Sequence, residues 1–98
     1  MLHKTVIQAG AIEDFLAERP GLSHIKVRAR GNLITLESVD EEGIVYPHAR
    51  FKRKGEAVHK WMLEMPTKNS WEVTFIEGTL TELMEILVEK FPWTLAER

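Results

Sequence analysis

The chain has 98 residues, of which 44% are hydrophobic and 29% are charged, and it contains no cysteine. This length and composition predict one globular domain over residues 1–98, and they exclude disulfides, thiolate nucleophiles and zinc-thiolate sites. The formal net charge of -2 excludes a strong overall attraction to nucleic acid. Since no apolar run of about 18 residues and no secretory-type segment occurs, we expect a cytoplasmic location and no membrane partner.

The first predicted element is an amphipathic helix over residues 5–18. Thr5 and Gln8 have capping-box spacing, and Pro20 followed by Gly21 ends the pattern. The apolar residues that repeat at helical spacing are Ala9, Ile12, Phe15 and Leu16.

A β-hairpin is predicted next, because apolar and polar residues alternate on both sides of Gly31-Asn32. With a two-residue turn, Val27 faces Leu36 inside the sheet and Lys26 faces Glu37 outside.

A third strand is predicted over residues 44–53, with Val45, Ala49 and Phe51 inward. The same alternation points Tyr46, His48, Arg50 and Lys52 outward. Pro47 interrupts this pattern, since proline offers no hydrogen-bond donor to a neighbouring strand. Either a bulge lies at Pro47 or the third strand is less central than a simple meander places it.

Two further strands lie on either side of a loop at residues 66–70, and residues 54–56 form the loop before them. Their alternation predicts inward side chains for six residues: Trp61, Leu63, Met65, Trp71, Val73 and Phe75.

A second helix begins after Gly78, where Thr79 and Glu82 repeat the capping-box spacing, and it ends before Pro92. The order helix, five strands, helix predicts an α+β fold with an antiparallel meander. Five strands span roughly 24 Å at about 4.8 Å each, a width that two packed helices nearly cover. We therefore expect both helices on one face of the sheet, which leaves the other face open.

The open face is expected to carry six cations and to form the working surface. These candidate binding residues are Lys26, Arg28, Arg30, Arg50, Lys52 and Lys60, with Tyr46, His48 and Met62 beside them. Three acids, Glu37, Glu64 and Glu72, and two more apolar residues, Ile44 and Ile76, are expected there too. The surface suits a polyanion such as single-stranded nucleic acid, or self-association or a protein partner through an apolar centre. It also matches the ordinary solvated side of a sheet.

Candidate chemistry is sparse. His48 and Tyr46 with Glu37 and Glu64 form the best acid-base cluster, although it needs a pocket to exclude water. Histidine spacing predicts no metal site, serines lack a Gly-x-Ser-x-Gly setting, and no phosphate-cradling loop exists, so we expect no cofactor and assign no catalytic residue.

Trp93 follows Pro92 and either covers the seam between helix and sheet or serves as an exposed partner anchor. The favoured hypothesis is a small non-enzymatic interaction module that binds a protein partner or a second copy through its open face. Nucleic-acid binding ranks second, and an enzyme using the His48 cluster ranks third.

Overall fold

The computed structural model describes residues 4–55 and 60–97. Helix α1 (Lys4–Ala17) is followed by the short 3-10 helix η1 (Pro20–Leu22) and then by the five strands. Helix α2 (Leu80–Lys90) and the 3-10 helix η2 (Pro92–Leu95) complete the chain. The strands are β1 (Lys26–Arg30), β2 (Leu33–Val39), β3 (Val45–Arg53), β4 (Trp61–Pro66) and β5 (Trp71–Gly78).

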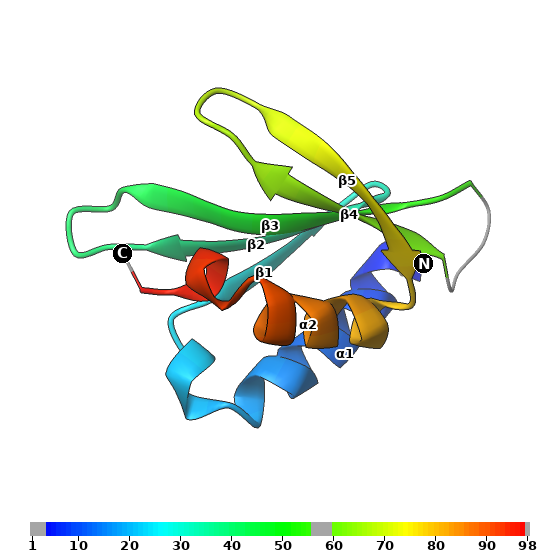
Figure 1. The fold of residues 1–98 in the computed structure, drawn as a ribbon. Helices are drawn as coiled ribbons and strands as arrows, with labels where there is room; N and C mark the ends of the chain where they lie inside the picture. The colour runs from blue at the N-terminus through cyan, green and yellow to red at the C-terminus, as the bar shows by residue number, and fades with distance from the viewer. Residues whose placement is uncertain (1–3, 56–59, 98) are drawn as a thin grey trace.

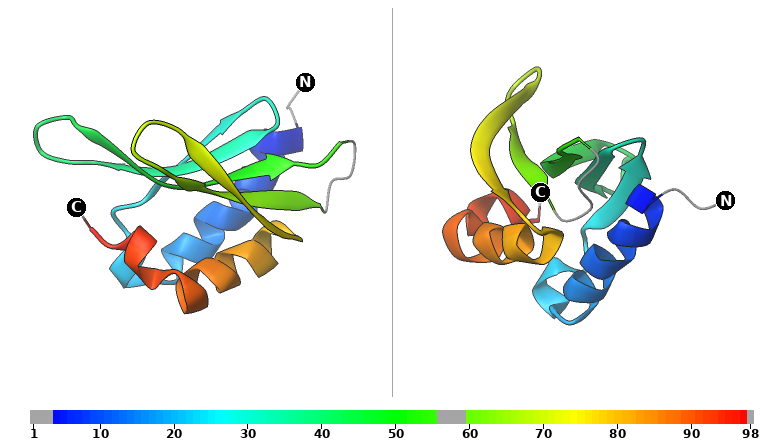
Figure 2. Two further views of the ribbon diagram at one scale, coloured as in Figure 1. Left: turned by 45° about the horizontal axis from the view of Figure 1, so that its top comes forward. Right: turned by 90° about the vertical axis from the view of Figure 1, so that its right-hand side faces the viewer.

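The five strands form one antiparallel sheet in the order β1-β2-β3-β4-β5, and both α-helices lie on one side of it (Figure 1). The predicted α+β class and meander order are therefore confirmed. The tip of the β4-β5 hairpin bends away from the helices, so the sheet is curled rather than flat (Figure 2).

The core lies between the sheet and the two helices. Ile12 of α1 and Leu87 of α2 meet the sheet residues Leu36, Phe51 and Trp61 there, and all five are almost completely buried. Burial of large apolar side chains contributes about 1.5–3 kcal/mol each to the free energy of folding. This packing fixes which face of the sheet is sheltered.

Local signals set α2 and the first hairpin as predicted. Thr79 and Glu82 make a complete capping box at the start of α2, with reciprocal bonds of 3.1 and 2.9 Å. Gly31 has a φ of 58°, as the first central position of a type II′ turn requires. The register pairs Val27 with Leu36 and Lys26 with Glu37, as expected.

A β-bulge in β3 overturns part of the predicted alternation. Ala49 pairs with Leu36, but the next pair joins Glu37 to Pro47, so His48 is an extra residue on β3. One extra residue reverses the side on which every earlier side chain lies. His48 is consequently buried on the helix side.

The predicted sides of two further β3 residues are wrong for the same reason. Tyr46 pairs with the buried Ser38 rather than lying on the open face. Val45 was expected inside but is 51% exposed. Beyond the bulge, Ala49 and Phe51 are buried as predicted.

The predicted side is also wrong for β5. Trp71 pairs with Pro66 across the loop, which places Trp71 on the face opposite the core, and Val73 pairs with Glu64 on that same face. Phe75 is 83% exposed, whereas Ile76 packs against the core. The error arises from the loop, whose length rather than the apolar pattern decides which side β5 presents.

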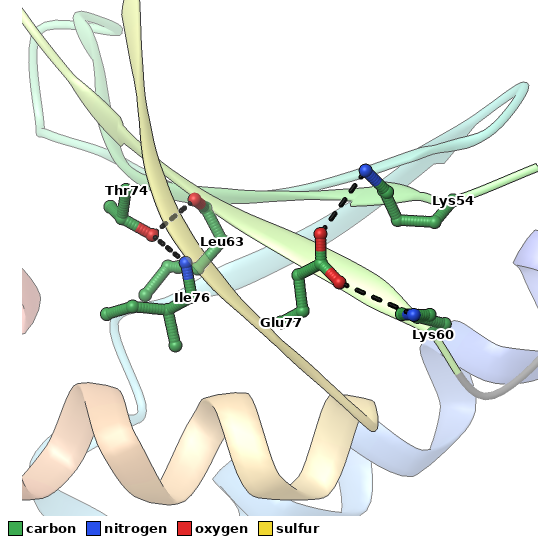
Figure 3. Close-up of polar contacts among 6 residues, drawn as sticks. All are labelled: Lys54, Lys60, Leu63, Thr74, Ile76 and Glu77. Carbon is green, nitrogen blue, oxygen red and sulfur yellow. Dashed lines mark hydrogen bonds and ion pairs between the residues drawn. The ribbon is translucent and has the colours of Figure 1, made fainter.

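A second bulge lies in the middle of β5 (Figure 3). Glu64 pairs with Val73 but Met62 pairs with Glu77, so two extra residues of β5 lie opposite Leu63. Thr74 Oγ1 donates to the Leu63 carbonyl at 2.7 Å and accepts from the Ile76 N–H at 3.1 Å. Two extra residues leave the alternation unchanged, so Val73 and Glu77 lie on the same face.

Candidate functional site

The face away from the helices brings together the cations of β1 and β3. Arg28 is opposite Thr35 and Thr35 is opposite Arg50, so both arginines lie on one side of the sheet, as the sequence predicts. By the same register Lys26, Arg30 and Lys52 lie on this side. We call this surface the open face.

Two acids of the open face each hold one arginine. The Arg50 Nη2 atom lies 2.6 Å from Glu64 Oε1 and its Nε donates to the same oxygen at 2.7 Å. Arg28 Nε lies 3.3 Å from Glu37 Oε1, in a more exposed pair. Among the residues that the structure describes, Lys26, Arg30 and Lys52 make no ion pair.

Trp71 is a part of this surface that sequence reasoning missed. The Arg50 guanidinium carbon lies 4.5 Å from the centroid of the Trp71 ring, in a cation-π contact. A small pocket of about 170 Å³ opens here. Its lining residues are Arg28, Arg30, Leu33, Thr35, Arg50 and Trp71. The four-residue loop before Trp71 was the signal that places it on this side.

Lys60 and Met62 border the same face but differ in accessibility. Lys60 is exposed and pairs at 3.7 Å with Glu77, which also holds Lys54 at 3.2 Å (Figure 3). Met62 pairs with Lys52 but is 7% exposed. Met62 therefore offers little apolar surface to a partner. Glu72 was expected on the open face, but it pairs with Met65, which packs against the core, so Glu72 lies on the other side of the sheet.

His48 lies at the centre of a buried polar cluster on the helix side of the sheet, not on the open face. Its Nε2 atom is 2.7 Å from Ser38 Oγ, and its Nδ1 atom is 2.6 Å from the carbonyl oxygen of Thr94. Thr94 returns a bond from its hydroxyl to the His48 carbonyl at 2.7 Å. The predicted grouping of His48 with Glu37 and Glu64 is thus wrong, because the bulge turned the ring away.

A second histidine joins this cluster from the loop after η1. His24 Nε2 lies 2.7 Å from the Leu95 carbonyl oxygen, and its ring contacts the His48 ring edge to face at 5.7 Å. Both histidines therefore bind the backbone of η2. His59 is outside the described residues.

A pocket of about 640 Å³ borders the cluster. It is lined by His24, Ser38, Val39, Asp40, Glu41, Glu42, Ile44, Tyr46 and Glu97. Asp40 lies at its rim, where hydrogen bonds from the Ile44 N–H, the Tyr46 hydroxyl and the Glu42 N–H lower the pKa of its carboxyl. The wall of this pocket is acidic.

Trp93 is 65% exposed on η2, and its ring contacts Phe91 edge to face at 5.5 Å. Of its two predicted roles, burial over the seam between helix and sheet is not observed. The role of Trp93 as a partner anchor stays a prediction.

Within residues 4–55 and 60–97, no three His, Asp or Glu side chains are grouped as metal ligands would be. No helix in this part of the chain has the length and apolar character needed to cross a bilayer. Comparison with protein-family models, with curated proteins and with solved structures found no match. The candidate sites therefore rest on their own geometry.

Proposed function

We propose that the protein is a binding module that holds an acidic segment of a partner protein on its open face. The observation that supports this most is the shared placement of Lys26, Arg28, Arg30, Arg50 and Lys52. Only two of these five are neutralised by an acid among the described residues, so the surface has an excess of positive charge. Complementary charge of this kind steers and selects partners.

The apolar part of the surface favours a peptide with an apolar side chain between its acids. Leu33 and Trp71 line the small pocket between the arginines, and both are half-buried, so each keeps some surface for a ligand. Tryptophan and arginine are the residues that contribute most at protein interfaces.

A second copy of the chain fits the open face less well. Ile76 packs against the core and Met62 is buried, so these two residues, which were expected at an apolar centre, offer little surface to a second copy. Two identical positive surfaces would also meet around a twofold axis, and like charges facing each other are destabilising.

The test is fluorescence anisotropy of a labelled peptide with glutamates around one leucine, titrated with the wild type and with charge-reversed variants. Arg30→Glu and Lys52→Glu each change an exposed cation that has no ion pair with any of the described residues, and we expect about tenfold weaker binding for each. Lys90→Glu is the matched control, because Lys90 is exposed on α2, on the other side of the sheet. Equal effects of all three substitutions would overturn the proposal.

Single-stranded nucleic acid is the second candidate, supported by Trp71 as a surface for base stacking beside Arg50. A labelled thymidine oligonucleotide in the same assay distinguishes the two. Binding tighter than that of the peptide, falling steeply between about 50 and 200 mM salt and lost in Trp71→Ala, would favour nucleic acid.

A further inference from the structure

The pocket beside the buried histidine cluster contains a serine in hydrogen-bond contact with an imidazole. It is distinct from the open face, since Ser38 and His48 lie on the helix side of the sheet. Chemistry in this pocket would therefore be independent of the proposed binding function.

The hydrogen bond between His48 and the Thr94 carbonyl fixes the position of one ring proton. A carbonyl oxygen only accepts, so Nδ1 carries the hydrogen that is donated to Thr94 at 2.6 Å. In the neutral ring Nε2 is then an acceptor, and the Ser38 hydroxyl donates to it at 2.7 Å. This is the arrangement in which an imidazole removes a proton from a serine, with a backbone carbonyl as the group that orients the ring.

The rigidity of the ring also suits that role. His48 is 0% exposed, and the bond from the Thr94 hydroxyl to the His48 carbonyl ties the same two residues together a second time. Neighbouring packing and hydrogen bonds that hold a base in one orientation are what general-base catalysis needs. Ser38 itself lines the pocket, so the cluster borders a space that a small molecule can enter.

We propose that Ser38 is a nucleophile activated by His48 and that the pocket accepts a small carboxylic ester. The lining acids Asp40, Glu41, Glu42 and Glu97 favour an uncharged or positively charged ester and disfavour a carboxylate. A volume of about 640 Å³ is that of an ordinary small-molecule site.

The reaction balances as an ester hydrolysis. Ser38 Oγ forms a bond to the ester carbonyl carbon while its proton passes to His48 Nε2. Collapse of the tetrahedral intermediate breaks the bond to the alcohol, which leaves with that proton, and the acyl group remains on Ser38. Water then attacks the acyl carbon and gives its proton to Nε2, and the carboxylic acid departs as Ser38 regains a proton.

The first experiment measures turnover of p-nitrophenyl acetate and, by mass spectrometry, acetylation of the peptide that contains Ser38. We expect Ser38→Ala to lower the rate about 100-fold, which is the size of effect that an activated nucleophile and its base supply. Ser70→Ala is the matched control, since Ser70 is exposed in the loop before β5 and does not line this pocket. Equal rates for wild type and Ser38→Ala would overturn the proposal.

A second experiment does not depend on the choice of ester. Because the chain has no cysteine, Ser38→Cys and Ser70→Cys each introduce a single thiol. A thiol beside His48 forms a thiolate, so Ser38→Cys should react with iodoacetamide about tenfold faster than Ser70→Cys at neutral pH. A purely structural cluster predicts the reverse order, because the thiol at position 38 is buried, and that order would refute the proposal.

Discussion

The Nδ1 atom of His48 lies 2.6 Å from the carbonyl oxygen of Thr94, which joins the bulge of β3 to η2 across 46 positions of the chain. His48 also has Ser38 on its other ring nitrogen, so one buried side chain satisfies two polar groups. A buried polar group that loses its hydrogen-bond partner lowers the stability of the folded state.

Replacing His48 by alanine should therefore lower the free energy of unfolding by about 2–4 kcal/mol, from lost packing and from the unsatisfied Ser38 and Thr94. Urea denaturation followed by circular dichroism measures the change. His24→Ala is the control with one lost bond to η2 and should cost about 1 kcal/mol. The opposite order of the two variants would contradict this account of the cluster.

The Arg50 and Glu64 pair should contribute more to stability than the Arg28 and Glu37 pair. The Glu64 side chain is 7% exposed, and Arg50→Ala leaves its carboxylate buried without a cation. We expect a loss of about 2–3 kcal/mol for Arg50→Ala. Arg28→Ala affects a pair whose arginine is 55% exposed and should cost less than about 1 kcal/mol. Denaturant titrations of both variants measure these losses. Equal losses of unfolding free energy would show that the buried Glu64 carboxylate does not need Arg50 as its counterion.

Phe75 has a φ of 64° and is 83% exposed, so its backbone is strained while its ring gains little from burial. Asparagine tolerates this conformation, and Phe75→Asn should raise the free energy of unfolding by about 0.5–1 kcal/mol. Phe75→Val should lower it by a similar amount, because a branched side chain is least tolerated there. Thermal unfolding of the two variants shows whether each substitution raises or lowers stability. A loss of stability in both variants would contradict the view that the backbone at Phe75 is strained.

Acid should weaken the turn between β2 and β3. The Ile44 N–H, followed by the Tyr46 hydroxyl and the Glu42 N–H, holds the pKa of Asp40 below its ordinary value of 3.8. The folded state therefore favours the carboxylate. Its contribution is complete above the unfolded pKa and is lost as the pH falls through 3.8 towards the lowered folded pKa.

The variant Asp40→Asn has no such titration. Its stability difference from the wild type should shrink as the pH is lowered from about 6 to about 2. Urea denaturation at several pH values measures this difference, and a gap that stays constant would exclude Asp40 as its source.

Much of the fold follows from local sequence signals, because these depend on near neighbours alone. The capping box at Thr79 and Glu82 set the start of α2, and Gly31-Asn32 set the register of the first hairpin. That register, continued to β3, also placed Arg28 and Arg50 on one face.

The failures arise because alternation within a strand reveals neither where the strand gains a residue nor which side the preceding loop gives it. Pro47 marked a possible bulge, but only the pairing shows that His48 is the extra residue. In β5 the alternation looked regular, and the loop pairing of Pro66 with Trp71 decided the side instead. The contact between Ser38 and His48 joins two strands, so it could not be predicted without locating the bulge at His48.

The bulge of β5 also makes the outer edge of the sheet irregular. β5 is the last strand of the sheet, and its outer edge carries Phe75 in a left-handed conformation between Thr74 and Ile76. A regular strand added along that edge would lose its hydrogen-bond ladder at Phe75, since the backbone there departs from the extended form. This edge is therefore a poor template for fibril growth or domain swapping, and the strand protects the molecule from aggregation through its own irregularity.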